Sequence, residues 1–133
     1  MAQSLKTVNV ITLFVEEQQR SKEFYERVFE VTADHEEDGT VIFRLDNLFL
    51  RLLTRSAAEK EMLGPIRPPG SDSGASFRLA VFVDDAATLC VSLAERGVTI
   101  AYGPVDRPWG VRNAAFLDPD GHVWVVSSDI PAD

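Results

Sequence analysis

The sequence lacks long apolar runs, disulfide-forming cysteines and a basic surplus. No run reaches the roughly 18 apolar residues of a membrane-spanning helix, and residues 1–6 carry no apolar signal core. These absences exclude a membrane span and a secretory signal, so we expect a cytoplasmic protein. The single cysteine, Cys90, cannot form an internal disulfide, and its place in an apolar stripe predicts a buried side chain.

Basic residues are scarce as well. Thirteen lysines and arginines stand against 21 acids, which gives a net charge of −8. Such a surface would repel a phosphate backbone, so we expect no nucleic-acid partner. It would attract a cationic small molecule, although acidity of this kind commonly serves only solubility. With 133 residues, 45% of them hydrophobic, the chain is long enough to bury a core and should fold.

The sequence does contain a weak internal repeat. Residues 12–30 and 80–97 each read as an apolar strand ending in Phe-Val, then two acids, then an amphipathic helix. The acid pairs Glu16–Glu17 and Asp84–Asp85 stand where carboxylates cap the free N–H groups of a helix start. We therefore interpret both pairs as helix caps, and Gly97 as the end of the second helix.

Three strand-like segments follow each helix, so each half reads β-α-β-β-β. The predicted strands are 31–35, 41–45 and 48–53 in the first half, and 99–102, 113–117 and 122–127 in the second. We assign one domain, 1–133, with a first module (7–54), a linker (55–75) and a second module (76–129). The linker is rich in proline, glycine and serine, and a short helix is predicted over 57–62.

Four short motifs run through this repeat. They are FY at 24–25, VDD at 83–85, PWG at 108–110 and F.DPDGH at 116–122. Together they resemble the vicinal oxygen chelate superfamily, which includes glyoxalase I, ring-cleaving dioxygenases and bleomycin-resistance proteins. The resemblance covers nearly the whole chain and is closest to the metal-free bleomycin-resistance branch. It implies an α+β fold in which two βαβββ modules form cupped mixed sheets.

The metal enzymes of that superfamily hold a divalent ion with one ligand on each of four strands. The resemblance places these positions at Val10, Leu50, Arg78 and Val125, none of which offers a metal donor. A shift of one residue exchanges the two faces of a strand and adds only Asn9 as a weak donor. We therefore expect no metal ligands, no cofactor and no catalytic residues.

His122 follows the turn Asp118–Gly121, whose proline and glycine suit a chain reversal. Strand alternation points its side chain away from the face of Val125. The sequence therefore predicts a structural hairpin and a solvated or capping histidine.

A cup without a metal can still bind a small molecule. The candidate ligand-binding residues are Val10, Thr12, Leu50, Arg78, Trp109, Arg112 and Val125. We expect Leu48, Leu52, Ala80 and Val123 to face inward beside them. Trp109 either stacks on a planar ligand or covers the core below its turn, and both interpretations stay open. Arg112, two positions after PWG, also appears in the bleomycin-resistance branch.

Arg78 is the most unusual of these residues. An arginine on the inward face of a central strand is costly to desolvate unless a carboxylate or an anion pairs with it. A glutamate or aspartate of the chain would give a structural explanation. Without such a partner the ligand should be an anion, in contrast to the cation that the net charge favours.

These patterns predict a metal-independent small-molecule binding protein, with an antibiotic as one possible ligand. A homodimer is expected, because paired modules of this superfamily often complete their cups across a two-fold axis. One alternative is a lyase, isomerase or oxygenase of the same superfamily, in which Arg78 polarises a substrate oxyanion. Another is a ligand-free interaction module with a fully packed cup. No membrane partner is expected.

Overall fold

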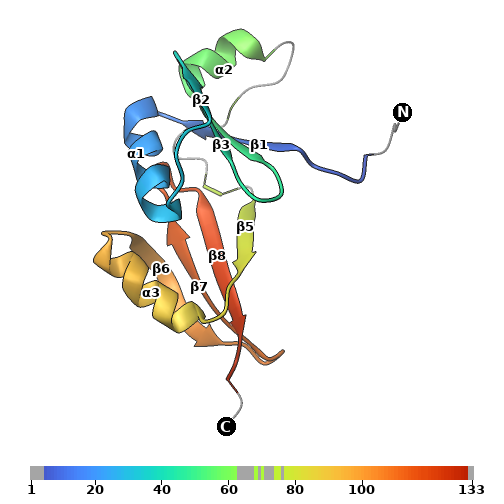
Figure 1. The fold of residues 1–133 in the computed structure, drawn as a ribbon, viewed down its shortest axis with the longest axis vertical. Helices are drawn as coiled ribbons and strands as arrows, with labels where there is room; N and C mark the ends of the chain where they lie inside the picture. Colours follow the sequence, from blue (N-terminus) through green and yellow to red (C-terminus); the bar gives the residue numbers. More distant parts are fainter. Residues whose placement is uncertain (1–4, 63–67, 69, 71–73, 76, 132–133) are drawn as a thin grey trace. The chain divides into compact units, whose positions relative to one another are not determined.

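The computed structural model describes residues 5–62, 68, 70, 74–75 and 77–131 (Figure 1). The chain divides into two compact units, Met1–Asp72 and Ser73–Asp133. Each unit contains a four-stranded mixed sheet with an amphipathic helix on one face. The α+β fold of two βαβββ repeats is confirmed. Within the described ranges, none of the helices is long and apolar enough to cross a membrane.

The first unit is ordered β1-β4-β3-β2, with β1 and β4 parallel and the other neighbours antiparallel. Its elements are β1 (Val10–Val15), α1 (Gln18–Phe29), β2 (His35–Glu37), β3 (Thr40–Arg44), β4 (Phe49–Thr54) and α2 (Arg55–Glu61). The apolar stripe of α1 packs on the sheet, where Tyr25 is fully buried and its ring lies 6.1 Å from that of Phe43. This packing forms the first core.

The second unit repeats the order as β5-β8-β7-β6, again with a parallel pair at the β5 edge. Its elements are β5 (Arg78–Phe82), α3 (Ala86–Glu95), β6 (Thr99–Asp106), β7 (Val111–Leu117) and β8 (Val123–Asp129). Trp124 and Phe116 stack at 6.4 Å between their ring centroids and are buried, as expected for residues beneath a helix. Cys90 is also buried, and desolvation raises the pKa of its thiol.

Two strand boundaries differ from the sequence prediction in a way that matters for the site. Strand β6 continues past Tyr102 to Asp106, and β7 begins at Val111 instead of Asn113. Gly103, at φ 88°, lets the chain continue through an irregularity in the β6–β7 pairing where a strand was expected to stop. The longer hairpin brings the turn 107–110 onto the end of the sheet.

The other boundaries shift by a few residues. Strand β2 spans His35–Glu37 instead of residues 31–35, and α2 begins at Arg55, where the Thr54 hydroxyl accepts a hydrogen bond from the N–H of Ala57. Only one of the two predicted acidic caps forms. Asp85 accepts a hydrogen bond from the N–H of Thr88, whereas Glu17 makes no capping bond with its side chain.

Candidate functional site

In the first unit, strand pairing decides which side chains share the sheet face that α1 leaves open. Residues directly opposite each other on neighbouring strands point to the same face. Val10 pairs with Phe49, Thr12 pairs with Arg51, and Leu50 pairs with Ile11. The open face therefore carries Val10, Thr12, Phe49 and Arg51.

The prediction that Leu50 and Leu52 share the face of Val10 is wrong. Leu50 and Leu52 are each 1% exposed and lie on the face that α1 covers. The register expected from the motifs was displaced by one residue in β4, and a displacement of one exchanges the two faces of a strand. Leu50 is a core residue, and Arg51 occupies the open face.

Arg51 makes three hydrogen bonds within its own unit. Its Nε donates to the Thr40 hydroxyl at 2.8 Å, and its two terminal nitrogens donate to the Glu61 carboxylate at 2.8 Å each. This bidentate pair joins β4 to α2, and it lowers the pKa of Glu61 while it raises the pKa of Arg51. The first unit therefore presents a closed polar contact and leaves no guanidinium N–H pair for a ligand at Arg51.

In the second unit, the predicted site residues do not all lie on the same face of the sheet. Arg78 pairs with Val123, and Val125 pairs with Ala80 and Ala115, so these side chains share the face opposite α3. Arg112 pairs instead with Ser128, whose hydroxyl accepts a hydrogen bond from the first N–H of α3.

Arg112 therefore lies away from Arg78 and Val125. Its guanidinium donates to both carboxylate oxygens of Asp106, at 2.6 and 3.2 Å, and these hydrogen bonds lower the pKa of Asp106. The structure does not bring Arg112 together with the other predicted site residues.

Arg78 has no carboxylate partner in the part of the chain that the structure describes. It lies on β5, which is an edge strand of its sheet and not a central one, so the desolvation cost expected for a central position does not arise. Its Nη1 donates to the Tyr102 hydroxyl at 3.2 Å. The acid that would have given a structural explanation for Arg78 is therefore not found among the described residues. Arg78 contacts a neutral oxygen instead.

Tyr102 crosses the open face from the opposite edge of the sheet. It pairs with Ala115 on β7, and its hydroxyl meets the Arg78 guanidinium from β5, so the two side chains together bridge β7 and β8. The helix of this unit, α3, lies on the other face, and Ala115 and Val125 are 1% and 4% exposed. Tyr102 and Arg78 lie on the same face as these two side chains.

Arg107, from the turn after β6, completes the cluster. Its Nε donates to the Asn113 side-chain oxygen at 3.2 Å, and its guanidinium carbon lies 5.5 Å from the Tyr102 ring centroid. The same carbon lies 6.0 Å from the Trp109 ring centroid. Trp109 is 70% exposed, so the interpretation that it covers the core is wrong.

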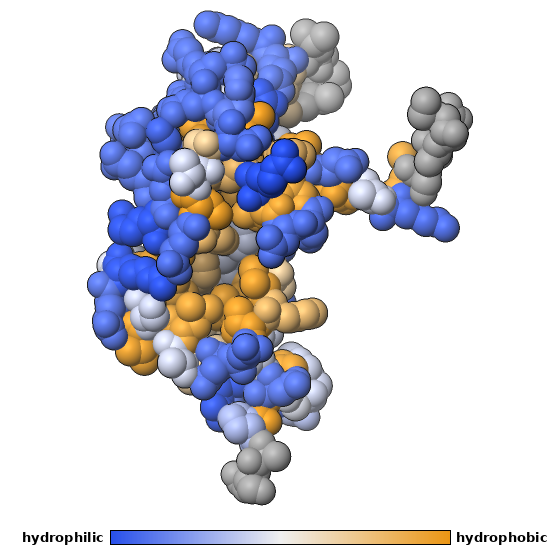
Figure 2. All heavy atoms as spheres, viewed as in Figure 1, coloured by the Kyte–Doolittle hydropathy of each residue, from blue (hydrophilic) through white to orange (hydrophobic). Residues whose placement is uncertain are grey.

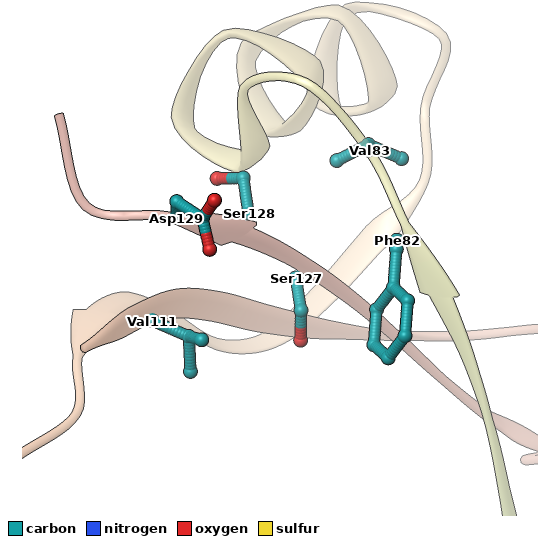
Figure 3. A pocket seen from close by; sticks show the side chains of 6 residues that line it. All are labelled: Phe82, Val83, Val111, Ser127, Ser128 and Asp129. Atoms are coloured by element: carbon teal, nitrogen blue, oxygen red, sulfur yellow. The ribbon is translucent and has the colours of Figure 1, made fainter. Parts of the chain in front are cut away.

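A shallow pocket adjoins this cluster on the second unit. Its volume is about 310 Å³. Ser127, one of the lining residues shown in Figure 3, pairs with Asn113 of the cluster. The lining residues are Phe82, Val83, Val111, Ser127, Ser128 and Asp129. Phe82 is 88% exposed, and hydrophobic residues (orange in Figure 2) lie on the surface of this unit. The open face thus combines apolar surface with a few polar groups.

The residues at the four family metal positions do not fit a divalent ion. Val10, Arg78 and Val125 offer no donor atom that a metal prefers, and the residues that replace Leu50 on the open face, Phe49 and Arg51, offer none either. The described ranges contain no group of three or more histidine, cysteine or acidic side chains that could hold a metal.

The sequence prediction missed Tyr102, Arg107 and Asn113. Ile100 and Tyr102 are two positions apart, so simple alternation places both against α3. The irregularity between them pairs Ile100 with Phe116 on the helix face and Tyr102 with Ala115 on the open face. The Gly103-Pro104 pair was the one local signal that this strand is irregular.

Comparison with known proteins supports the superfamily resemblance found in the sequence. The family model described as Glyoxalase/Bleomycin resistance protein/Dioxygenase superfamily matches residues 7–126. A glyoxalase/bleomycin resistance protein/dioxygenase from Nocardioides superposes with a TM-score of 0.83 at 23% identity, covering 99% of this chain and 89% of that one. No curated protein matches the sequence.

Two further solved structures share the fold. A glyoxalase-related enzyme from Fulvimarina pelagi has a TM-score of 0.79 at 23% identity, covering 97% of this chain and 95% of that one. A lactoylglutathione lyase from Agrobacterium tumefaciens has a TM-score of 0.74 at 18% identity, covering 94% and 95%. At these identities the likeness concerns the fold.

Proposed function

The chain belongs to the Glyoxalase/Bleomycin resistance protein/Dioxygenase superfamily, and from that premise we propose a metal-independent small-molecule binding protein. Its ligand lies on the open face of the second unit. The convergence of Arg78, Tyr102 and Arg107 on that face supports the proposal most directly. These side chains come from two strands and a turn, and they meet beside a pocket.

The dimensions and chemistry of the face suit a small ligand. Pockets for small molecules are commonly about 300–1,000 Å³ and combine apolar walls with a few placed polar groups. The pocket here, of about 310 Å³, lies at the lower end of that range and has Phe82 and Val111 as apolar walls. A ligand that fills it can extend along the sheet to Tyr102, because Asn113 and Ser127 are neighbours.

Binding fits this cluster better than catalysis does. A general base is most often an imidazole or a carboxylate, and a catalytic metal is commonly held by the same groups. The groups that contact Tyr102 are two guanidiniums, which are always protonated in proteins. Asp129 is a carboxylate that lines the pocket. Its position in the strand is opposite Val111, at the end of the sheet. The cluster can hold and orient a ligand with these groups.

A titration followed by nuclear magnetic resonance tests the proposal. The ¹⁵N-labelled protein is titrated, in buffer containing a metal chelator, with a fragment set of anionic, neutral and cationic members that includes planar antibiotics of the bleomycin type. We expect saturable shifts at Tyr102, Asn113 and Val125, and none clustered on α1. A folded protein without saturable shifts would favour the ligand-free interaction module. Binding that appears only after a divalent ion is added would contradict metal independence.

A further inference from the structure

We infer that the ligand is an organic anion whose carboxylate or phosphonate group binds between Arg78 and Arg107. The inference rests on the proposed binding function and adds the chemical class of the ligand. It starts from how the arginines of this acidic protein are paired. Among the described residues, several arginines lie within 4.0 Å of a carboxylate, including Arg20, Arg44, Arg51, Arg55 and Arg112. Arg27, Arg78 and Arg107 have no such neighbour among the described residues. Arg27 lies over the Phe24 ring on α1, whereas Arg78 and Arg107 both contact Tyr102.

Both of these guanidiniums contact neutral oxygen atoms instead. Arg78 donates to the Tyr102 hydroxyl at 3.2 Å, and Arg107 donates to the Asn113 amide oxygen at 3.2 Å. A neutral acceptor fixes the orientation of a guanidinium without cancelling its charge. The chain has 21 acids and 13 basic residues, so two neighbouring cations without an acid stand out against its composition.

The unused donors match an oxyanion. A guanidinium carries five N–H donors in one plane, and its edge can bind both oxygens of a carboxylate or phosphonate. The protein contacts above use one N–H of each arginine. The Tyr102 hydroxyl accepts from Arg78 and so keeps its own hydrogen to donate. The two guanidiniums and the Tyr102 hydroxyl therefore offer three donor groups on the open face.

The surroundings indicate an aromatic or apolar body for this anion. Trp109 is 70% exposed and lies beside Arg107, and the adjoining pocket contains Phe82. A cation, which the net charge of −8 favours at long range, would meet two guanidiniums here. Local contacts outweigh the distant field at this spot, because screening limits that field to about 10 Å at 0.1 M salt.

A charge-matched series of probes tests the inference. Benzoate, benzamide and benzylamine share one ring and differ in charge, and phenylphosphonate adds a second oxyanion. Each is titrated into the labelled protein at constant ionic strength. We expect benzoate and phenylphosphonate to saturate the shifts of Tyr102 and Asn113. Benzamide should bind at least about 10-fold more weakly, since hydrogen bonds to charged groups are the stronger ones, and benzylamine should not bind.

Arginine variants locate the anion. Arg78→Gln and Arg107→Gln should each weaken benzoate binding about 10-fold or more. Arg112→Gln is the matched control, because it makes the same charge change in the same unit but on the opposite face, beside Asp106. It should leave the affinity within about two-fold, since it removes no hydrogen bond to the anion. Amide spectra of all three variants verify that they fold.

Failure of the inference can be told apart from failure of the proposed function. If benzamide or benzylamine binds the same residues as tightly as benzoate, the anion is wrong while binding on this face stands. An equal loss in all three variants would overturn the inference as well, because it would show a response to net charge. If no oxyanion probe binds, the inference fails, and the broader fragment set decides separately whether the face binds a small molecule at all.

Discussion

Asp118 holds the turn between β7 and β8 with one carboxylate oxygen. That oxygen accepts hydrogen bonds from the backbone N–H of Asp120 at 3.0 Å and of His122 at 2.8 Å, and Asp118 is only 5% exposed. A buried side chain that satisfies two N–H groups is costly to remove. The hairpin that the sequence predicted is organised by this aspartate.

Replacing Asp118 should therefore destabilise the second unit. We expect Asp118→Ala to lower the free energy of unfolding by about 1–3 kcal/mol, because two N–H groups lose their acceptor. Asp118→Asn keeps an acceptor oxygen and should lose less. Urea unfolding followed by circular dichroism measures both variants. Equal stability of Asp118→Ala and the unmodified protein would contradict this role.

At the scale of elements, the two acid pairs before α1 and α3 look alike in the sequence but differ in the structure. The Asp85 side chain accepts a hydrogen bond from the N–H of Thr88 at the start of α3, whereas Glu17 makes no capping bond with its side chain. The hydrogen bonds from Thr88 hold the pKa of Asp85 below its ordinary value. Asp85→Ala should therefore lower the urea midpoint at neutral pH, and Glu17→Ala should change it less.

The pH dependence gives this comparison a second readout. A carboxyl group whose pKa is lowered by folding stabilises the fold above its ordinary pKa, and this contribution is lost as the pH falls through the lowered pKa. The difference between Asp85→Ala and the unmodified protein should shrink in acid. A difference that stays constant from neutral pH to acid would contradict capping by the ionised carboxylate.

Helix α2 depends on a glycine in the turn between β2 and β3. Gly39 has φ 89°, and a Cβ built on it would lie 2.7 Å from the Cβ of Ala57 in α2. Gly39→Ala should cost about 1–3 kcal/mol for overpacking, in addition to backbone strain of about 1–2 kcal/mol. Gly97→Ala is the matched control, because Gly97 has φ 81° with nothing within 4 Å. Denaturant unfolding should show the larger loss for Gly39→Ala.

Element by element, the sequence determined more of the fold than of the site. The period of the helices and the repeated Phe-Val-acid-acid pattern sufficed for the α+β fold of two βαβββ repeats. The faces of β4 could not be predicted, because alternation does not set the absolute register and both Leu50 and Arg51 suited a strand. The cluster at Tyr102 depends on an irregularity in β6 that alternation does not encode.

At the scale of the whole molecule, we expect a homodimer. Strand β5 is an edge strand, and Val81 on its helix side is 39% exposed because α3 covers mainly β6 and β7. An apolar edge strand can be covered by its own copy across a two-fold axis, the commonest symmetry of soluble assemblies. Light scattering after gel filtration should give about twice the 14.7 kDa of one chain. A mass of one chain at micromolar protein would contradict the dimer.

Metal content is the remaining property of the whole molecule that the site chemistry predicts. Two of the family's four metal positions hold valine, a third holds Arg78, and the open-face residues beside Leu50 are Phe49 and Arg51. A guanidinium at such a position repels a cation, and aliphatic carbon donates no electron pair. The protein, purified without chelator or affinity-tag metal, should therefore hold no stoichiometric divalent ion by elemental mass spectrometry. Thermal unfolding should be the same with and without a chelator, since no metal stabilises the folded state. About one zinc, nickel, iron or manganese per chain would overturn the metal-independent assignment, because it would require ligands that these four positions do not supply.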